Sequence, residues 1–64
     1  MRMQQVLTLK PGDVIEDSVS RQKATVLKEP DEEGVLLEWH DSGKKVVRVL
    51  RGFRKSRLVR REGE

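Results

Sequence analysis

The chain has 64 residues, no cysteine, a single histidine and a formal net charge of +3, so disulfides are excluded and a structural zinc site lacks an adequate ligand set. A chain of this length holds one domain with a small core, because it buries only about 60% of the surface that its unfolded form exposes, and self-association is the remaining source of extra stability. No apolar run has the length of a signal peptide or of a membrane span, which predicts a cytoplasmic protein.

The first half of the chain predicts two short strands separated by loops. Residues 10–13 contain Pro-Gly and predict a turn, after which residues 14–15 begin a strand and residues 16–21 form a polar loop. Residues 22–29 predict a second strand around a Thr-Val-Leu run, with a helix as the alternative. Residues 30–34 combine proline, three acidic residues and glycine, and predict an acidic hairpin loop.

A β-hairpin is the clearest element of the second half. Residues 34–40 alternate so that Val35, Leu37 and Trp39 fall on one face of a strand. Residues 44–51 are rich in β-branched side chains, and the short glycine-containing connection before them predicts that the two strands pair.

The last part of the chain allows two interpretations. The favoured prediction is a tight turn at residues 52–56, formed as one turn of 3-10 helix. A last strand follows at residues 57–60. The alternative is a basic amphipathic helix over residues 46–61, which Gly52 would destabilise by roughly 1 kcal/mol and which the valines disfavour.

The opening Gly12-Asp13-Val14-Ile15, followed by the strand at residues 24–27, the central hairpin and the tight turn at Phe53, resembles an SH3-like small barrel of the Tudor or KOW kind. The resemblance implies an all-β fold, a small five-stranded SH3-like barrel with a short 3-10 turn before the last strand. Residues 1–64 would form this single domain, with a core at about residues 10–61 and loosely ordered ends at residues 1–5 and 62–64. Barrels of this kind imply a non-catalytic module that binds nucleic acid, ribosomal or transcription components, or peptides.

The aromatic content departs from one branch of that family. Tudor domains that recognise methylated side chains use a cage of several aromatic rings, whereas this chain has only Trp39 and Phe53. A methyl-lysine reader is therefore disfavoured. Both rings are interpreted as core, and Trp39 has the alternative role of stacking on a nucleic-acid base.

Charge is distributed unevenly along the chain. Residues 1–43 contain five Lys or Arg and nine Asp or Glu, which sum to −4, whereas residues 44–64 contain nine Lys or Arg and two Glu, which sum to +7. An arginine-rich surface attracts polyanions and binds phosphates in a bidentate way. The predicted nucleic-acid-binding residues are Lys44, Lys45, Arg48, Arg51, Arg54, Lys55, Arg57, Arg60 and Arg61. The alternative is that these charges only solvate the surface or pair with the acidic half.

Catalytic chemistry has little support in the residues. Glu38 and His40 share a strand face, which suggests a metal pair or an acid–base pair, but a third ligand is missing and a solvated histidine at a hairpin end explains the same pattern. The serines have no histidine and acid arranged to activate them, and the glycines are isolated. We therefore predict no enzyme activity, no catalytic residue, no metal and no cofactor.

Three functional hypotheses follow. The leading one is a small basic protein that holds the phosphate backbone of DNA or RNA, in an accessory role, with no membrane partner and no small-molecule substrate. The second is a protein-interaction module, such as a small regulator that docks on a larger enzyme or associates with itself. The third is an active site shared between the subunits of an oligomer.

Overall fold

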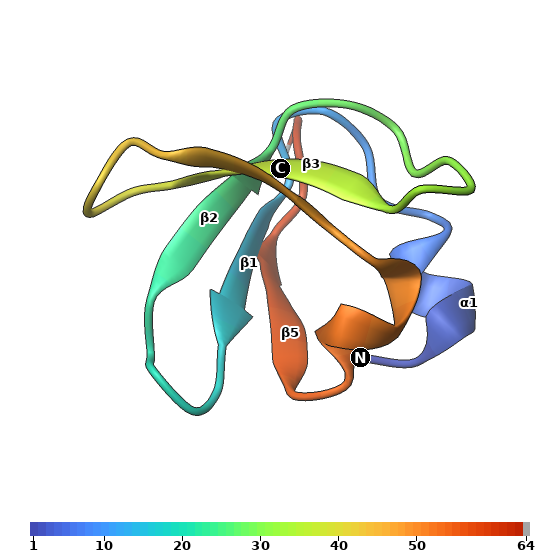
Figure 1. The fold of residues 1–64 in the computed structure, drawn as a ribbon, viewed down its shortest axis with the longest axis horizontal. Helices are drawn as coiled ribbons and strands as arrows, with labels where there is room; N and C mark the ends of the chain where they lie inside the picture. Colours follow the sequence, from blue (N-terminus) through green and yellow to red (C-terminus); the bar gives the residue numbers. More distant parts are fainter. Residues whose placement is uncertain (64) are drawn as a thin grey trace.

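The computed structural model describes residues 1–63 (Figure 1). Along the chain it contains α1 (Met3–Val6), β1 (Val14–Asp17), β2 (Lys23–Val26), β3 (Val35–Trp39), β4 (Lys45–Arg48), the 3-10 turn η1 (Leu50–Phe53) and β5 (Ser56–Arg60). The strands form one sheet in the order β4-β3-β2-β1-β5, and every neighbouring pair is antiparallel. The predicted small fold, mostly β with five strands and a 3-10 turn before the last one, is confirmed.

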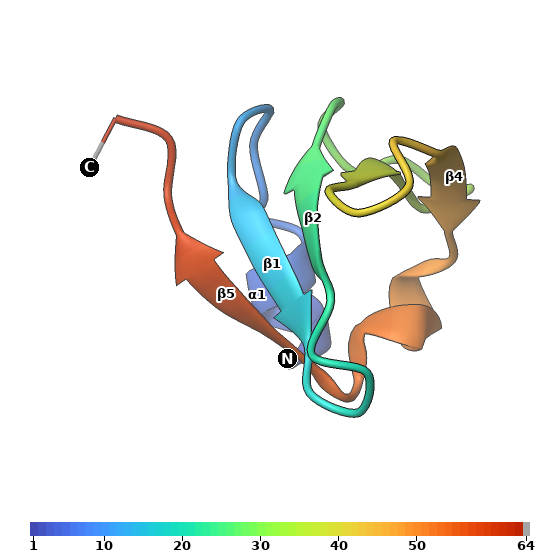
Figure 2. The ribbon, with the colours of Figure 1, turned by 90° about the vertical axis from the view of Figure 1, so that its left-hand side faces the viewer.

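The sheet bends strongly but its hydrogen-bonded ladder is open. β4 and β5 are the two edge strands, and within residues 1–63 no strand pairing joins them. In Figure 2, β5, β1 and β2 lie side by side, while β3 and β4 turn away from them over the far side of the molecule. The ladder alone therefore does not establish the predicted closed barrel.

β1 is longer than the sequence predicted. Glu16 and Asp17, which we expected in a loop, pair with residues of β5, and Glu16 also pairs with Lys23 of β2. A carboxylate in a central strand opposes ordinary strand propensity. Arg57 of the neighbouring strand β5 compensates for it by pairing with the Glu16 carboxylate. The register shifts between Val14 and Ile15, where β5 carries one extra residue opposite β1.

The core lies inside the bend of the sheet. Its buried residues are Val6, Leu9, Ile15, Ala24, Val26, Val35, Leu37 and Phe53. Val35 and Leu37 point into it and Trp39 packs against it, as the two-residue alternation predicted. Phe53 is fully buried beneath the 3-10 turn, which confirms its predicted role.

The N-terminal segment is packed, although we predicted residues 1–5 to be loosely ordered; of the other predicted loose end, residues 62–64, Glu64 lies outside the described residues. The Met1 nitrogen donates to the carbonyl oxygens of Arg54 (3.1 Å) and Ser56 (2.8 Å), and α1 follows directly. α1 lies beside η1 in Figure 1, and Val6 and Leu9 are buried in the core. The packed region therefore begins before residue 10. A four-residue helix leaves too short a periodic pattern to be recognised in the sequence.

The hairpin and the turn after it settle the choice between strand and helix. β3 and β4 pair from Val35 with Arg48 to Glu38 with Lys45, and β4 ends at Arg48, so the rival helix over residues 46–61 is wrong.

Gly34, directly before β3, has a φ of +136°, and an added Cβ would lie 2.7 Å from the carbonyl carbon of Arg48. Only glycine combines this dihedral with such a close approach between backbones.

No helix among residues 1–63 has both the length and the apolar character needed to cross a membrane.

Candidate nucleic-acid interface

The nine predicted binding residues do not form one surface. Three separate groups occur: Lys44 and Lys45 at the start of β4, then Arg51, Arg54 and Lys55 in and after η1, then Arg60 and Arg61 at the end of β5. The η1 group and the β5-end group lie at opposite ends of β5, roughly 13 Å apart at about 3.3 Å per residue. The two remaining arginines, Arg48 and Arg57, are engaged in ion pairs within the fold.

Arg48 is directed inward and takes part in the packing. Its guanidinium carbon lies 5.0 Å from the centroid of the Trp39 ring and 5.6 Å from that of Phe53, which are cation–π distances. Its Nη1 donates to the Ser56 Oγ (3.2 Å), and its Nη2 lies 3.8 Å from an Asp17 carboxylate oxygen. Arg48 is therefore a structural residue, and it occupies a face of the Trp39 ring that base stacking would need.

Arg57 is tied to the carboxylate of Glu16 on the outer face of the sheet. Its Nε donates to the Glu16 Oε1 at 2.9 Å, and its Nη2 lies 2.8 Å from the same oxygen. Glu16 is 6% exposed, and Arg21 also approaches it at 4.0 Å. The guanidinium of Arg57 therefore forms its ion pair within the fold, although 67% of the side chain remains exposed.

Arg60 faces a hollow on the outer face of the sheet that the sequence did not predict. The hollow has a volume of about 290 Å³ and is lined by Val14, Lys23, His40, Val59 and Arg60. Val14 and Val59 supply its apolar surface, while Lys23, His40 and Arg60 bring polar side chains from three separate segments of the chain. Such convergence of two cations and an imidazole on one small hollow is suited to an anion.

Strand register explains why these side chains meet. Val14 of β1 is the direct partner of Arg60 in β5 and of Thr25 in β2, so all three side chains lie on the same face. A hydrogen bond of 2.7 Å joins the Thr25 Oγ1 to the His40 Nε2, which holds the imidazole over β2. The His40 backbone nitrogen also donates to the Lys23 carbonyl oxygen (3.0 Å). His40 is exposed, as a solvated histidine at a hairpin end would be, and these two bonds also fix its position beside β2.

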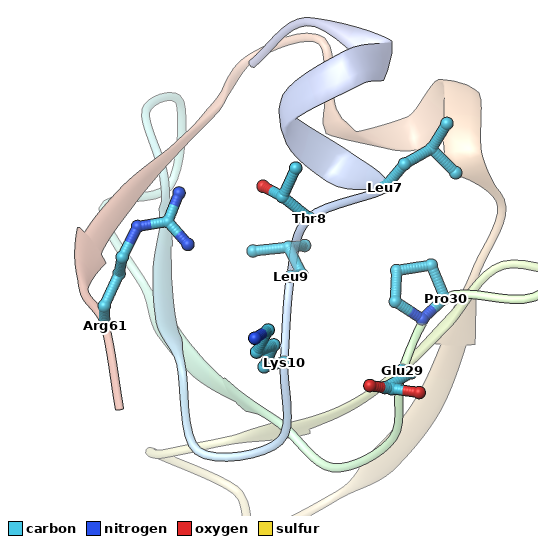
Figure 3. A pocket seen from close by; sticks show the side chains of 7 residues that line it. All are labelled: Leu7, Thr8, Leu9, Lys10, Glu29, Pro30 and Arg61. Carbon is cyan, nitrogen blue, oxygen red and sulfur yellow. The ribbon is translucent and has the colours of Figure 1, made fainter. Parts of the chain in front are cut away.

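Arg61 lines a second hollow, on the opposite side of the end of β5 from the hollow at Arg60. This hollow, of about 550 Å³, is lined by Leu7, Thr8, Leu9, Lys10, Glu29, Pro30 and Arg61. In Figure 3 the guanidinium of Arg61 extends toward Thr8, while Glu29 and Pro30 lie across the hollow. Lys10 and Arg61 have no ion-pair partner among residues 1–63.

Buried Asp13 brings the two walls of the second hollow together. One carboxylate oxygen accepts from the Lys10 backbone nitrogen (2.9 Å) and the other accepts from that of Glu62 (2.8 Å). Asp13 is 2% exposed, so these bonds fasten the turn before β1 to the segment after β5. As a result, Lys10 and Arg61 line the same hollow although 51 positions separate them in the sequence.

Arg60 ends β5 and Arg61 follows it, and the two side chains line different hollows, so positive charge lies on both sides of the edge strand β5. Each meets a lysine from the acidic half of the chain, Lys23 and Lys10 respectively. Summing charge along the sequence assigned both lysines to a negative region. A correct prediction of the pairing register of β1 with β2 and β5 would have placed Lys23 near Arg60.

Metal binding at Glu38 and His40 gains no further ligand from the fold. Among residues 1–63 no group of three His, Cys, Asp or Glu side chains is placed to hold a metal ion.

Comparison of the chain with protein-family models, curated proteins and solved structures found no match, so the site is interpreted from its own chemistry.

Proposed function

We propose that this protein is a non-catalytic module that binds the phosphate backbone of nucleic acid across the end of β5, with Lys10, Lys23, Arg60 and Arg61 as the principal contacts. The observation that carries the proposal is the convergence of Lys23, His40 and Arg60 on one outer-face hollow. The hollow at Arg61 and Lys10 lies on the other side of the same edge strand. A backbone that crosses this edge meets cations on both sides.

The proposed fold assignment is a half-open SH3-like barrel. Its support is the strand order β4-β3-β2-β1-β5 together with a 3-10 turn between β4 and β5. Arg48 bridges the two edge strands where ladder hydrogen bonds do not, through Ser56 of β5 and Asp17 of β1. In this arrangement the outer face of β1, β2 and β5 is free of packed elements and available to a ligand.

The chemistry of the site favours phosphate over bases. Arg60 and Lys23 are exposed basic side chains, and Val14 and Val59 present methyl groups that suit the sugar between two phosphates. No aromatic residue lines either hollow, and Trp39 is packed beneath Arg48. We therefore propose binding with little base readout, on DNA or RNA, and with a steep dependence on salt.

Titration of a labelled duplex and a labelled single strand tests the proposal, with anisotropy as the readout. Four cations that contact phosphate give a log–log salt slope of about −3 to −4 for duplex between about 50 and 200 mM salt. The variant Lys23→Glu plus Arg60→Glu should abolish binding at low salt.

Two matched double variants locate the site. Lys44→Glu plus Lys45→Glu changes the charge by the same amount at the hairpin, and Arg51→Glu plus Arg54→Glu does so at η1. The proposal requires the Lys23 and Arg60 variant to lose much more affinity than either of these. Equal losses in all three would indicate a general charge effect and would overturn the assigned site, and absence of low-salt binding by the unaltered protein would overturn the function.

A further inference from the structure

An apolar groove with charged ends lies on the α1 and η1 side of the molecule. It consists of two adjoining hollows of about 300 and 400 Å³ that share Met3, Leu50 and Arg51. Met3 and Val49 are 43% and 61% exposed, which is high for apolar side chains in so small a domain. Their exposure next to one another marks a surface suited to a protein partner.

The two ends of the groove carry opposite charge. Arg54 lines one hollow and Glu32 and Glu33 line the other, with Arg51 between them. All four side chains are exposed, and none forms an ion pair within residues 1–63. The groove is therefore polarised, with Met3, Leu50 and Arg51 in its middle.

We infer that the occupant of this groove is a second copy of the chain, docked about a two-fold axis through the Met3 and Leu50 region. A two-fold axis sets the same patch against itself in the reversed direction. The arginine end of one copy then meets the glutamate end of the other, at both ends of the interface. The exposed methionine and valine side chains of the two copies meet in the middle and exclude water from one another.

Charge favours a second copy over other occupants. A nucleic-acid backbone or an anionic membrane would be attracted by Arg51 and Arg54 but repelled by Glu32 and Glu33 in the same groove. In a two-fold pair each Arg54 end instead meets a Glu32 and Glu33 end, and only Arg51, near the axis, faces its own copy. The groove shares no lining residue with the two hollows at the end of β5.

The size of the domain sets the expected affinity. A standard interface covers about 800 Å² on each partner, roughly a sixth of the 4662 Å² accessible surface of this chain. The four charged side chains of the groove are exposed to solvent in the free protein, and their desolvation opposes association. We therefore expect a dissociation constant between about 1 µM and 1 mM, and an equilibrium that follows concentration.

Sedimentation equilibrium of the full chain over this concentration range is the test. The expected result is a transition from 7.4 kDa to twice that mass. Either Arg51→Glu plus Arg54→Glu or Glu32→Lys plus Glu33→Lys should weaken the dimer at least about tenfold, because each sets like charges against one another at both ends. An equimolar mixture of the two variants should recover the affinity as a heterodimer, since both ends are then complementary.

Lys44→Glu plus Lys45→Glu serves as the matched control, with the same change in charge outside the groove, and should leave the dimer constant unchanged. Circular dichroism establishes that each variant is folded. A monomer throughout the range, an assembly larger than a dimer, a dimer indifferent to both charge reversals, or a mixture that fails to recover would each overturn the inference.

Discussion

The Nη2 of Arg48 lies 3.8 Å from the Oδ2 of Asp17, which joins β4 to the end of β1 across the open side of the sheet. Both side chains are mostly buried, at 22% and 23% exposure. Arg48 also donates to Ser56 at the start of β5, so one side chain links both edge strands. Arg48, although it belongs to the basic residues 44–64, therefore stabilises the fold and adds little to the positive potential at the protein surface.

Replacement of Arg48 by alanine should lower the free energy of unfolding by about 2 kcal/mol. The change removes two cation–π contacts and a hydrogen bond from a half-buried position. Urea unfolding followed by Trp39 fluorescence measures the loss. Arg51→Ala, three residues later and exposed, should stay within about 0.5 kcal/mol, and a comparable loss there would contradict the assigned role of Arg48.

The Arg57–Glu16 pair should respond asymmetrically to mutation. Arg57→Met leaves a carboxylate that is 6% exposed without its principal partner, and should cost about 1 to 2 kcal/mol after allowance for the exposure of the arginine. Glu16→Gln retains an oxygen that can accept from the Arg57 Nε, and should cost less. Chemical unfolding of both variants decides the matter, and a larger loss for the glutamine variant would refute this account.

Gly34→Ala should be among the most damaging small substitutions in the chain. The added Cβ meets the Arg48 carbonyl group, and the φ of +136° is strained for any side chain. We expect a loss of more than about 2 kcal/mol in unfolding free energy. At Gly43, which has a φ of +70° and open space around it, alanine should cost about 1 kcal/mol. Similar thermal midpoints for the two variants would show that the close approach to β4 does not matter.

Val6 and Leu7 provide a test of the packed N-terminal segment with neighbouring residues. Val6 is fully buried and Leu7 is 57% exposed. Val6→Asp places an unpaired charge in the core and should unfold the domain, with a loss of about 3 kcal/mol or more. Leu7→Asp should leave the near-UV circular dichroism unchanged. A folded Val6→Asp protein would mean that α1 is dispensable.

Local alternation and turn chemistry predicted most of the fold. The pattern of Val35, Leu37 and Trp39 and the glycine-containing connection after it determined the β3–β4 hairpin correctly. Glu16 was misplaced in a loop because its burial depends on Arg57, a partner 41 positions away that no local pattern reveals. α1 was missed because its four residues are stabilised by packing on the core rather than by periodicity.

The candidate site was predicted only in part for a related reason. Arg60 and Arg61 were among the predicted contacts, but Arg48 was directed into the interior and Arg57 was paired. Summing charge over sequence segments takes no account of which residues the fold brings together. The fold instead brings Lys10 and Lys23 from the acidic half to the end of β5, because β1 pairs with both β2 and β5 and Asp13 bonds to Lys10 and Glu62.

Asp13 should control the order of the segment that carries Arg61. Its two carboxylate oxygens accept from the backbone nitrogens of Lys10 and Glu62, and asparagine at this position can replace only one of them because its amide nitrogen is a donor. Asp13→Asn should therefore cost about 1 to 3 kcal/mol, the penalty for a buried group left without its partner. Amide hydrogen exchange resolves the site: protection at Glu62 should fall while protection in the β2–β3 pairing falls only by the global loss. If the two fall equally, the carboxylate contributes only general stability. A selective loss at Glu62 accompanied by weaker nucleic-acid binding would instead tie the position of Arg61 to its buried anchor.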